Sequence, residues 1–254
     1  MTEVKTKTKA KKKKGKWLII VAVILVILTG IGFLGYKTLK IAKLDVKGNS
    51  IVSTEVILGL ADIQIGESLL SVSNSKVEAN IEKNPYLIFD SINRVFPDTI
   101  IINVKERTPK AIIQYVGSTV IIDANGYVLA VADNNTNNAI PVLKGVAVKT
   151  ATVGSTLEPD NKYQLNQVKE IIAGLEKEEV YGIITEINMT DPNSIVLTTN
   201  DGYTVKLGEF ENIQYKIRFF KTTRDQIIQM GKSGGTIDVT TGDKAYYEPS
   251  SSTQ

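Results

Sequence analysis

The chain has no cysteine and no histidine among its 254 residues, and it has a single tryptophan. Without cysteine it cannot form a disulfide, an iron–sulfur cluster or a thiolate nucleophile. Without histidine it has no Ser-His-Asp system, no histidine proton shuttle and no imidazole ligand for a metal. The catalytic chemistry that remains is limited to carboxylate pairs, a Ser-Lys dyad and all-oxygen Mg²⁺ or Ca²⁺ sites. Much of ordinary enzyme chemistry is therefore excluded.

The charge is distributed unevenly along the chain. The net charge is +3, but residues 1–16 contain eight lysines against one glutamate. Residues 44–254 contain 19 lysines and arginines against 26 acidic residues. A basic tail is therefore followed by an acidic body, and between them lies the uncharged run WLIIVAVILVILTGIGFLGY, residues 17–36.

The uncharged run has the length and composition of a membrane-spanning helix. At a rise of about 1.5 Å per residue, it would extend for about 30 Å, which is the thickness of the hydrocarbon core of a bilayer. Trp17 and Tyr36 stand at its ends, where aromatic rings prefer the headgroup layer. A buried core helix would not explain these features together. A cleavable signal peptide has a shorter apolar region, of about 7 to 15 residues, and a small-x-small cleavage site.

The lysines predict the orientation of this helix. Eight precede the run and three, Lys37, Lys40 and Lys43, follow it. Because lysine-rich flanks stay in the cytoplasm, we expect a single-pass protein of the plasma membrane whose body is exported. The lysine tail would also attract anionic lipid, at about 1 kcal/mol per charge. A nucleic-acid-binding arm is disfavoured because no aromatic residue is interleaved with the lysines.

Residues 41–107 predict a small unit with the order β-α-α-β-β. Ser53 is a candidate N-cap for a first short helix, and the Ser75-Lys76-Val77-Glu78 sequence has the form of a capping box for a second. Two β-rich runs, residues 86–95 and 99–105, follow on either side of a Phe-Pro-Asp turn. The two helices can cover one face of a three-stranded sheet.

Residues 110–240 predict a mostly β structure with two helices. Asn125-Gly126 and Asn200-Asp201-Gly202 stand between alternating apolar runs, as in β-hairpins. Apolar stripes with helical spacing predict one helix from about residue 161 and another over about residues 209–230. A last strand is expected over residues 236–240, followed by Tyr246 and Tyr247 and by a polar, disordered end.

Three motifs suggest catalysis or ligand binding, and each has a simpler explanation. Ser73 and Lys76 satisfy the Ser-x-x-Lys pattern of penicillin-binding enzymes, but the companion motifs are absent. Gly231-Lys232-Ser233 resembles the end of a phosphate-binding loop without its first glycine. The acidic residues at 176, 178 and 179 lack the spacing of a calcium loop and are typical of a solvated helix end.

The expected last strand is a candidate binding edge. The edge of a sheet carries unpaired N–H and C=O groups, which an extended partner peptide can satisfy by adding a strand. A strand near the end of the chain that follows a long helix is a candidate for such an edge, although most terminal strands only complete their own sheet.

The order of these elements resembles that of the FtsQ/DivIB family of bacterial division proteins. The resemblance covers about residues 5–247. It rests on Pro85-Tyr86, Arg94-Val95-Phe96-Pro97, the VKERTP sequence at 104–109, the VIIDANGYVL sequence at 120–129 and Ile140-Pro141-Val142-Leu143. It implies an α+β fold with a single-pass transmembrane helix, a β-α-α-β-β POTRA domain and a mostly antiparallel β domain with two helices. The expected segments are a basic cytoplasmic tail (1–16), the transmembrane helix (17–36), the POTRA domain (37–108), the β domain (109–247) and a disordered tail (248–254).

The resemblance also implies a function. Members of this family are non-enzymatic scaffolds of the division machinery, and their last strand and the preceding helix hold partners of the FtsL and FtsB/DivIC type. The corresponding partner-binding positions in this chain are Ile237, Asp238, Val239, Thr240, Tyr246, Tyr247, Lys216 and Lys221. Thr240 departs from the basic residue that is common in the family, so an ion pair at that position is in doubt. The expected location is the division septum.

No cofactor, metal, nucleic acid or small-molecule substrate is expected. Two other functions stay open at this point. One is a membrane-anchored cell-wall enzyme that uses carboxylates or the Ser73 and Lys76 pair. The other is a POTRA module for secretion or outer-membrane assembly, which would be expected to carry tandem POTRA repeats or a following barrel.

Overall fold

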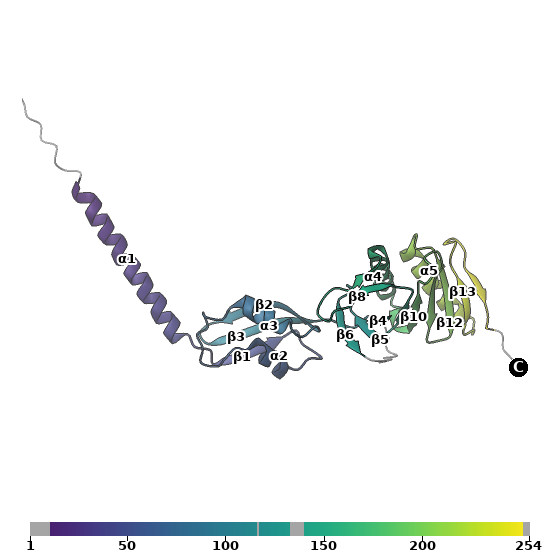
Figure 1. Ribbon diagram of the computed structural model, residues 1–254, viewed down its shortest axis with the longest axis horizontal. Coiled ribbons are helices and arrows are strands. Elements are labelled where there is room, and N and C mark those ends of the chain that lie inside the picture. Colours follow the sequence, from purple (N-terminus) through teal and green to yellow (C-terminus); the bar gives the residue numbers. More distant parts are fainter. Residues whose placement is uncertain (1–10, 116, 133–139, 251–254) are drawn as a thin grey trace, which may run out of the picture. The chain divides into compact units, whose positions relative to one another are not determined.

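The computed structural model describes residues 11–115, 117–132 and 140–250. A first helix, α1 (Lys11–Thr38), precedes two compact sets of strands and helices (Figure 1). Residues Phe89–Glu106 and the chain up to Ile81 form the first compact unit, and residues Glu82–Ile88 with the chain from Arg107 onward form the second. Part of the predicted basic tail, residues 1–10, and the last four residues of the predicted disordered tail lie outside the described residues.

Helix α1 contains the whole uncharged run of the sequence. Ten large apolar side chains between Trp17 and Leu28 are at least half exposed. Side chains are described without interruption over residues 17–30, whereas the uncharged run continues to Tyr36. Among the residues that the structure describes, no helix is long and apolar enough to cross a membrane.

The first unit has the predicted β-α-α-β-β order. Its elements are β1 (Lys43–Lys47), α2 (Thr54–Ala61), α3 (Asn74–Ile81), β2 (Leu87–Val95) and β3 (Thr99–Glu106). The strand order is β1-β3-β2, and β1 runs parallel to β3 with Lys43 opposite Thr99. Alternate residues of β3 are buried, as expected for a strand that turns one face to a core. Ile57 of α2 and Ile81 of α3 are fully buried in the same unit.

The helix caps of this unit match the sequence at one helix and not at the other. Ser53 caps α2 as predicted, because its hydroxyl accepts from the N–H of Val56. The predicted capping box at Ser75 and Glu78 is wrong. Helix α3 begins two residues earlier, and the Ser73 hydroxyl accepts from the N–H of Lys76. Ser75 therefore lies inside the helix.

A carboxylate clamp closes the turn between β1 and α2. The Glu106 carboxylate accepts hydrogen bonds from the N–H groups of Ser50, Ile51 and Val52 at 2.8 to 3.0 Å, and from the Ser50 hydroxyl at 2.8 Å. Burial raises the pKa of Glu106, but these donors outweigh burial and bring the pKa to about 2, below its ordinary value of 4.5. The clamp therefore depends on an ionised carboxylate.

Acid is expected to weaken the first unit through this clamp. The pKa of Glu106 is lower in the folded protein than in the unfolded chain, so its contribution is complete above about pH 4.5 and is lost as the pH falls toward 2. After a discount for solvent screening, the contribution is about 1 to 2 kcal/mol. Thermal unfolding at pH 7 and pH 3 should show a smaller acid loss for Glu106→Gln than for the unchanged protein. Glu78→Gln, at an exposed position of α3, is the matched control and should keep the full acid loss.

The second unit is built on a nine-stranded mixed sheet. Its strand order is β14-β13-β12-β11-β10-β7-β4-β5-β6. The strands of this sheet are β4 (Ala111–Tyr115), β5 (Ser118–Ile122), β6 (Val128–Ala132), β7 (Val142–Lys144), β10 (Ile184–Asn188), β11 (Ile195–Thr199), β12 (Tyr203–Gly208), β13 (Gly235–Asp238) and β14 (Tyr246–Glu248). A separate two-stranded ribbon pairs β8 (Val148–Thr150) with β9 (Glu158–Pro159), and the unit also contains α4 (Lys162–Lys177), η1 (Tyr181–Ile183) and α5 (Ile213–Gln229). Both predicted hairpins, β5-β6 and β11-β12, are present.

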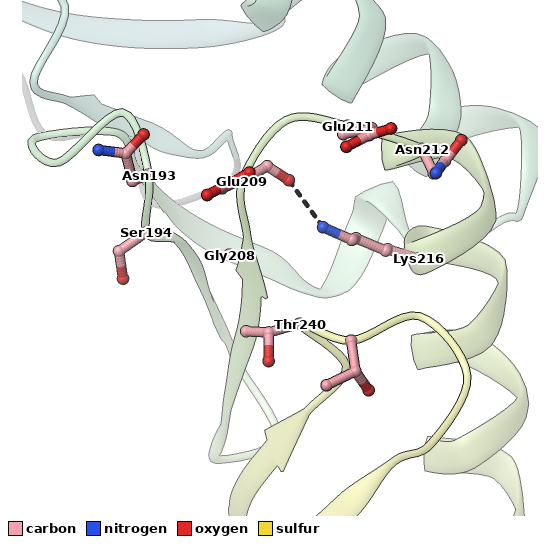
Figure 2. Close-up of a pocket in the computed structure, with 9 residues that line it drawn as sticks. Asn193, Ser194, Gly208, Glu209, Glu211, Asn212, Lys216 and Thr240 are labelled. Atoms are coloured by element: carbon pink, nitrogen blue, oxygen red, sulfur yellow. Dashed lines mark hydrogen bonds between the residues drawn. The ribbon is translucent and has the colours of Figure 1, made fainter.

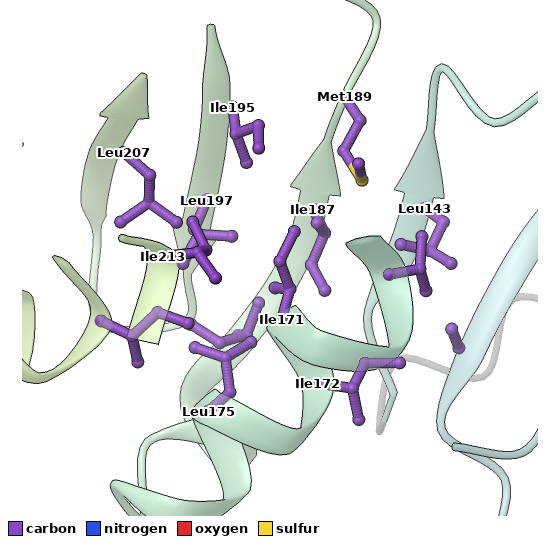
Figure 3. Close-up of a cluster of buried hydrophobic side chains, with 14 of the residues drawn as sticks. Leu143, Ile171, Ile172, Leu175, Ile187, Met189, Ile195, Leu197, Leu207 and Ile213 are labelled. Carbon is purple, nitrogen blue, oxygen red and sulfur yellow. The ribbon is translucent and has the colours of Figure 1, made fainter. Parts of the chain in front are cut away.

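The main core of the second unit lies between one face of the nine-stranded sheet and the helices α4 and α5. Figure 3 shows Ile171, Ile172 and Leu175 of α4 pointing toward the strands of the sheet. All three are fully buried, and full burial of each such side chain stabilises the fold by about 1.5 to 3 kcal/mol. The two helices also contact each other, since the Gln214 side chain donates to the carbonyl of Glu170 at 2.7 Å.

Helix α4 begins where the sequence predicts, whereas α5 begins later than predicted. Helix α4 begins as predicted, with Asn161 as N-cap accepting from the N–H of Tyr163 at 2.9 Å. Helix α5 begins at Ile213 and not at residue 209, because Asn212 is in the left-handed conformation. Phe210 therefore lies in a turn, where its ring makes an edge-to-face contact with Tyr163.

Candidate functional site

The strand predicted to end the sheet is β13, and it is not an edge strand. It runs parallel to β12 on one side and antiparallel to β14 on the other. Ile237 and Val239 are fully buried. The sequence-based expectation of an edge at residues 236–240 is therefore wrong, and the end of the sheet is formed by β14, which contains Tyr246 and Tyr247 (Figure 1).

The turn between β13 and β14 is held by short polar contacts. The carboxylate of Asp238 accepts from the N–H of Thr240 at 3.0 Å and from its hydroxyl at 2.8 Å. The N–H of Gly242 donates to the carbonyl of Val239, and the Thr241 hydroxyl donates to the carbonyl of Lys244. Asp238 and Thr240 thus hold the chain reversal that returns β14 to the sheet.

The two tyrosines of β14 have different environments. Tyr246 is 61% exposed, and Tyr247 is partly buried against the main core. The Tyr247 hydroxyl donates to the carbonyl of Gly234 at 2.9 Å, which ties β14 to the loop before β13. The outer edge of β14 therefore presents backbone groups together with the exposed side chain of Tyr246.

A polar pocket lies where β12 ends and α5 begins, next to the turn that follows β13 (Figure 2). Its volume is about 370 Å³, and its walls include Ser194, Gly208, Glu209, Lys216 and Thr240. The side chain of Lys216 is buried, and its ammonium donates to the carbonyl of Glu209 at 2.8 Å. Two of the predicted partner-binding residues, Lys216 and Thr240, are therefore brought together in one pocket.

Lys221 does not line this pocket. It lies further along α5, where its ammonium pairs with Asp225 at 3.1 Å and both side chains are partly exposed. Arg224, on the same helix, donates from Nε at 2.8 Å and from Nη2 at 2.5 Å to Oδ2 of Asp201, in the turn between β11 and β12. Residue spacing does not identify this pair, because only the packing of α5 on the sheet brings the two residues together.

The structure separates the two members of the possible Ser-Lys pair. The Ser73 hydroxyl accepts from the backbone N–H of Lys76, whereas the Lys76 ammonium pairs with Asp62 at 3.2 Å. Glu176 and Glu178 pair with Lys110 and Arg218. Over the described ranges, no group of three or more acidic side chains is arranged to hold a metal ion. These residues are accounted for by a helix cap and by ion pairs.

Comparison with known proteins gives matches in both units. A family model described as "POTRA domain, FtsQ-type" matches residues 39–107, and one described as "Cell division protein FtsQ/DivIB, C-terminal" matches residues 111–240. The second match alone covers more than half of the chain.

Curated relatives include cell division protein FtsQ of Syntrophotalea carbinolica and cell division protein DivIB of Clostridium tetani. Each is 27% identical, over 186 and 173 residues respectively, which is 68% of this chain in both cases. These matches cover 64% and 65% of the two relatives, so the chain spans slightly less than two thirds of their length. The solved extracytoplasmic domain of DivIB from Geobacillus stearothermophilus is 17% identical, with a TM-score of 0.30 over 50% of this chain and 92% of that one.

Proposed function

The chain belongs to the FtsQ/DivIB family of cell division proteins, and we propose that it is a non-enzymatic, membrane-anchored scaffold of the bacterial division machinery. In this proposal the exported units hold a coiled-coil pair of the FtsL and FtsB/DivIC type at the division septum. The observation that carries the proposal is the position of β14 at the end of the nine-stranded sheet.

The apolar run is proposed to be the membrane anchor. Its support is the uncharged stretch of 20 residues, the aromatic residues at its two ends and the eight lysines before it. The exposure of the apolar side chains between Trp17 and Leu28 is consistent with a lipid environment, because water would disfavour so many exposed apolar groups. The protein would then lie in the plasma membrane with its N-terminus in the cytoplasm, where the lysine tail attracts anionic lipid.

The partner is proposed to bind at β14 by strand addition. The outward backbone groups of an edge strand can pair with an extended peptide, and side-chain contacts then supply specificity. Because β14 has only three residues, the ladder it offers is short. The exposed Tyr246 and the pocket around Lys216, which the turn between β13 and β14 helps to line, would supply further contacts.

Paired substitutions at Tyr246 and Tyr247 test strand addition. In an antiparallel ladder the N–H groups of consecutive residues point alternately toward the neighbouring strand and away from it. Proline at one of these two positions therefore removes an outward donor, whereas alanine removes the same side chain and keeps the donor. We expect the proline variant to bind the partner pair at least about tenfold more weakly than the alanine variant at one of the two positions, or about 1.4 kcal/mol.

The affinities are measured with the full chain in detergent and a purified FtsL and FtsB/DivIC-type pair. Equal affinities for the proline and alanine variants at both positions would contradict strand addition at β14. Proline at Ile237 or Val239 is not a suitable test, because β13 is paired on both sides and both residues are buried.

A further inference from the structure

We propose that one end of the first unit rests on the lipid surface, with four apolar side chains inserted at the headgroup boundary. These four residues, which we name the apolar collar, are Ile65, Leu70, Val95 and Phe96. The inference rests on the membrane anchor proposed above, and it adds a second contact with the membrane that the anchor itself does not require.

The collar residues are unusually exposed for apolar side chains. Their exposed fractions are 62% for Ile65, 50% for Leu70, 46% for Val95 and 61% for Phe96. A single exposed apolar residue needs no explanation, but several at one end of a small unit mark an interaction surface. They come from two segments that are far apart in the sequence: the loop between α2 and α3, and the end of β2 with the turn that follows it.

Backbone hydrogen bonds hold both loops against residues 39–43. The N–H groups of Gly66 and Leu69 donate to the carbonyls of Ile41 and Leu39, each at 2.8 Å. In the other loop, the carbonyl of Asp98 accepts from the N–H of Ala42 at 2.8 Å. Each collar residue therefore lies no more than three positions along the chain from a residue whose backbone is hydrogen-bonded to residues 39–43.

Arg94 joins the two loops to each other. Its guanidinium donates from Nε to the carbonyl of Leu69 at 3.1 Å and from Nη2 to the carbonyl of Val72 at 2.6 Å. It also donates to the Asn74 side chain at 3.0 Å. Since Arg94 immediately precedes Val95, the loop that carries Leu70 and the end of β2, with Val95 and the following Phe96, are held side by side.

The short connection between the uncharged run and residue 39 places this end of the unit near the membrane. Leu39 is only three residues after Tyr36, the last residue of the uncharged run, and three residues span at most about 11 Å. The headgroup layer on each side of a bilayer is about 5 to 8 Å thick. If the run spans the bilayer, the segment that holds both loops cannot be far from the headgroups, and apolar side chains that reach this boundary gain by leaving water.

The charged residues near the apolar collar carry both signs. Lys40 and Lys43 are exposed, but Glu67 is also exposed and Asp98 is partly exposed in the same loops. These four charges balance, but Arg94 and Lys37, which directly follows the uncharged run, add two positive charges. Attraction to anionic lipid therefore acts together with the apolar side chains, which gain by leaving water at the lipid boundary.

The first unit also contains a matched control. Ile51 is 80% exposed, more than any residue of the collar. It lies in the turn clamped by Glu106 at the end of β3, whereas the collar lies at the start of β1 and β3, where Lys43 stands opposite Thr99. Residue 51 is thus an exposed apolar position at the opposite end of the sheet.

The test uses single cysteines, which can be labelled uniquely because the chain contains no cysteine of its own. Full-length Phe96→Cys, Leu70→Cys and Ile51→Cys variants carry an environment-sensitive fluorophore. They are reconstituted without any other protein into vesicles of phosphatidylethanolamine and phosphatidylglycerol. Circular dichroism confirms that each labelled variant is folded as the unlabelled chain is. Quenching by brominated lipid and by aqueous iodide is then compared among the three labels.

We expect the labels at 96 and 70 to lose most of their emission with brominated lipid and to resist iodide, and the label at 51 to behave in the opposite way. If the protein stays in the vesicles after a carbonate wash but the collar labels are quenched by iodide as readily as the label at 51, the collar is wrong and the anchor stands. Release of the protein by carbonate would overturn both. Lipid quenching at residue 51 as well would overturn the proposed orientation of the first unit on the membrane.

Discussion

Replacing Asp123 with alanine is expected to lower the stability of the second unit by about 3 to 5 kcal/mol, the usual cost of removing one partner from a buried ion pair. The Arg107 guanidinium lies 3.0 Å from the Asp123 carboxylate, and the two side chains are only 17% and 6% exposed. The same carboxylate accepts from the N–H groups of Asn125 and Tyr127, each at 2.8 Å, in the turn of the β5-β6 hairpin. One substitution therefore removes an ion pair and a turn contact together.

The loss would also leave Arg107 without its acidic partner in a poorly solvated position. Its guanidinium carbon lies 3.8 Å from the centre of the Tyr127 ring, a contact that the alanine variant would retain but that cannot replace a carboxylate. The matched variant is Asp123→Asn, whose amide oxygen can still accept from the turn. We expect it to lose about 1 to 2 kcal/mol, because it forfeits the charge and keeps the turn.

Native-state hydrogen exchange of the β4 to β6 amides is the suitable measurement, since it reports on this unit separately from the first. For the alanine variant, protection is expected to fall by about two to four orders of magnitude. If the alanine and asparagine variants lose equal protection, the turn contact contributes nothing beyond the ion pair. If the asparagine variant loses no protection, the buried charge pair is not the cause of the loss.

The parts of the fold that the sequence predicted well are those whose signals are local. Ser53 is predicted as an N-cap because a polar side chain directly precedes an apolar helical stripe, and its hydroxyl accepts the expected N–H bond. The stripe that starts at about residue 161 likewise predicts the start of α4, where the structure shows Asn161 as the N-cap. The hairpin at Asn125-Gly126 was predicted from a turn signal between alternating apolar runs. In each case the residues that decide the structure lie within about one turn of one another.

The errors occurred where a distant residue decides between local alternatives. Ser73 and Ser75 are both reasonable caps for α3. Arg94 binds the carbonyl of Val72, just before the helix, and the side chain of Asn74, its first residue, so the helix starts directly after Ser73. Helix α5 was predicted to start too early because its apolar stripe extends back to Phe210. There, the carbonyl of Glu209 is bonded instead to the buried ammonium of Lys216. Neither contact can be read from residue spacing.

The candidate site was predicted only in part for the same reason. The family resemblance implies Tyr246 and Tyr247 as partner positions, but it does not predict that they form a strand, because the three residues of β14 are too few for an alternating pattern. The strand forms only because the chain after the turn fits closely against β13. Gly235 is the residue at which this fit is closest.

Gly235→Ala is expected to detach β14 from the sheet and to weaken partner binding by at least about tenfold, or about 1.4 kcal/mol. A Cβ at this position would clash with the carbonyl oxygen of Glu248 and would lie 2.9 Å from the backbone nitrogen of Ser250. Gly235 also has a φ of +107°, a conformation that other residues rarely adopt. Because β14 contributes only three residue pairs, moving it away is the least costly way to relieve the contact.

Gly242 separates the effect of this contact from the effect of the backbone conformation. It lies in the turn of the same hairpin with a φ of +75°, but among the described residues no atom beyond its two chain neighbours lies within 4 Å of an added Cβ. Gly242→Ala should therefore cost about 1 kcal/mol of backbone strain and leave β14 in place. Hydrogen exchange should show loss of protection at residues 246–248 in Gly235→Ala only, with β11 and β12 still protected in both variants.

The direction of the change in affinity decides between two roles for β14. If β14 is the template for strand addition, its detachment removes the site, and Gly235→Ala must bind the partner pair more weakly than Gly242→Ala. If β14 is instead a cover that the partner displaces, detachment exposes the edge of β13 in advance, and Gly235→Ala would bind more tightly, because the cost of displacement is already met. A higher affinity would therefore refute strand addition at β14 and transfer the site to β13, where Ile237 and Asp238 pair with β14 in the free protein.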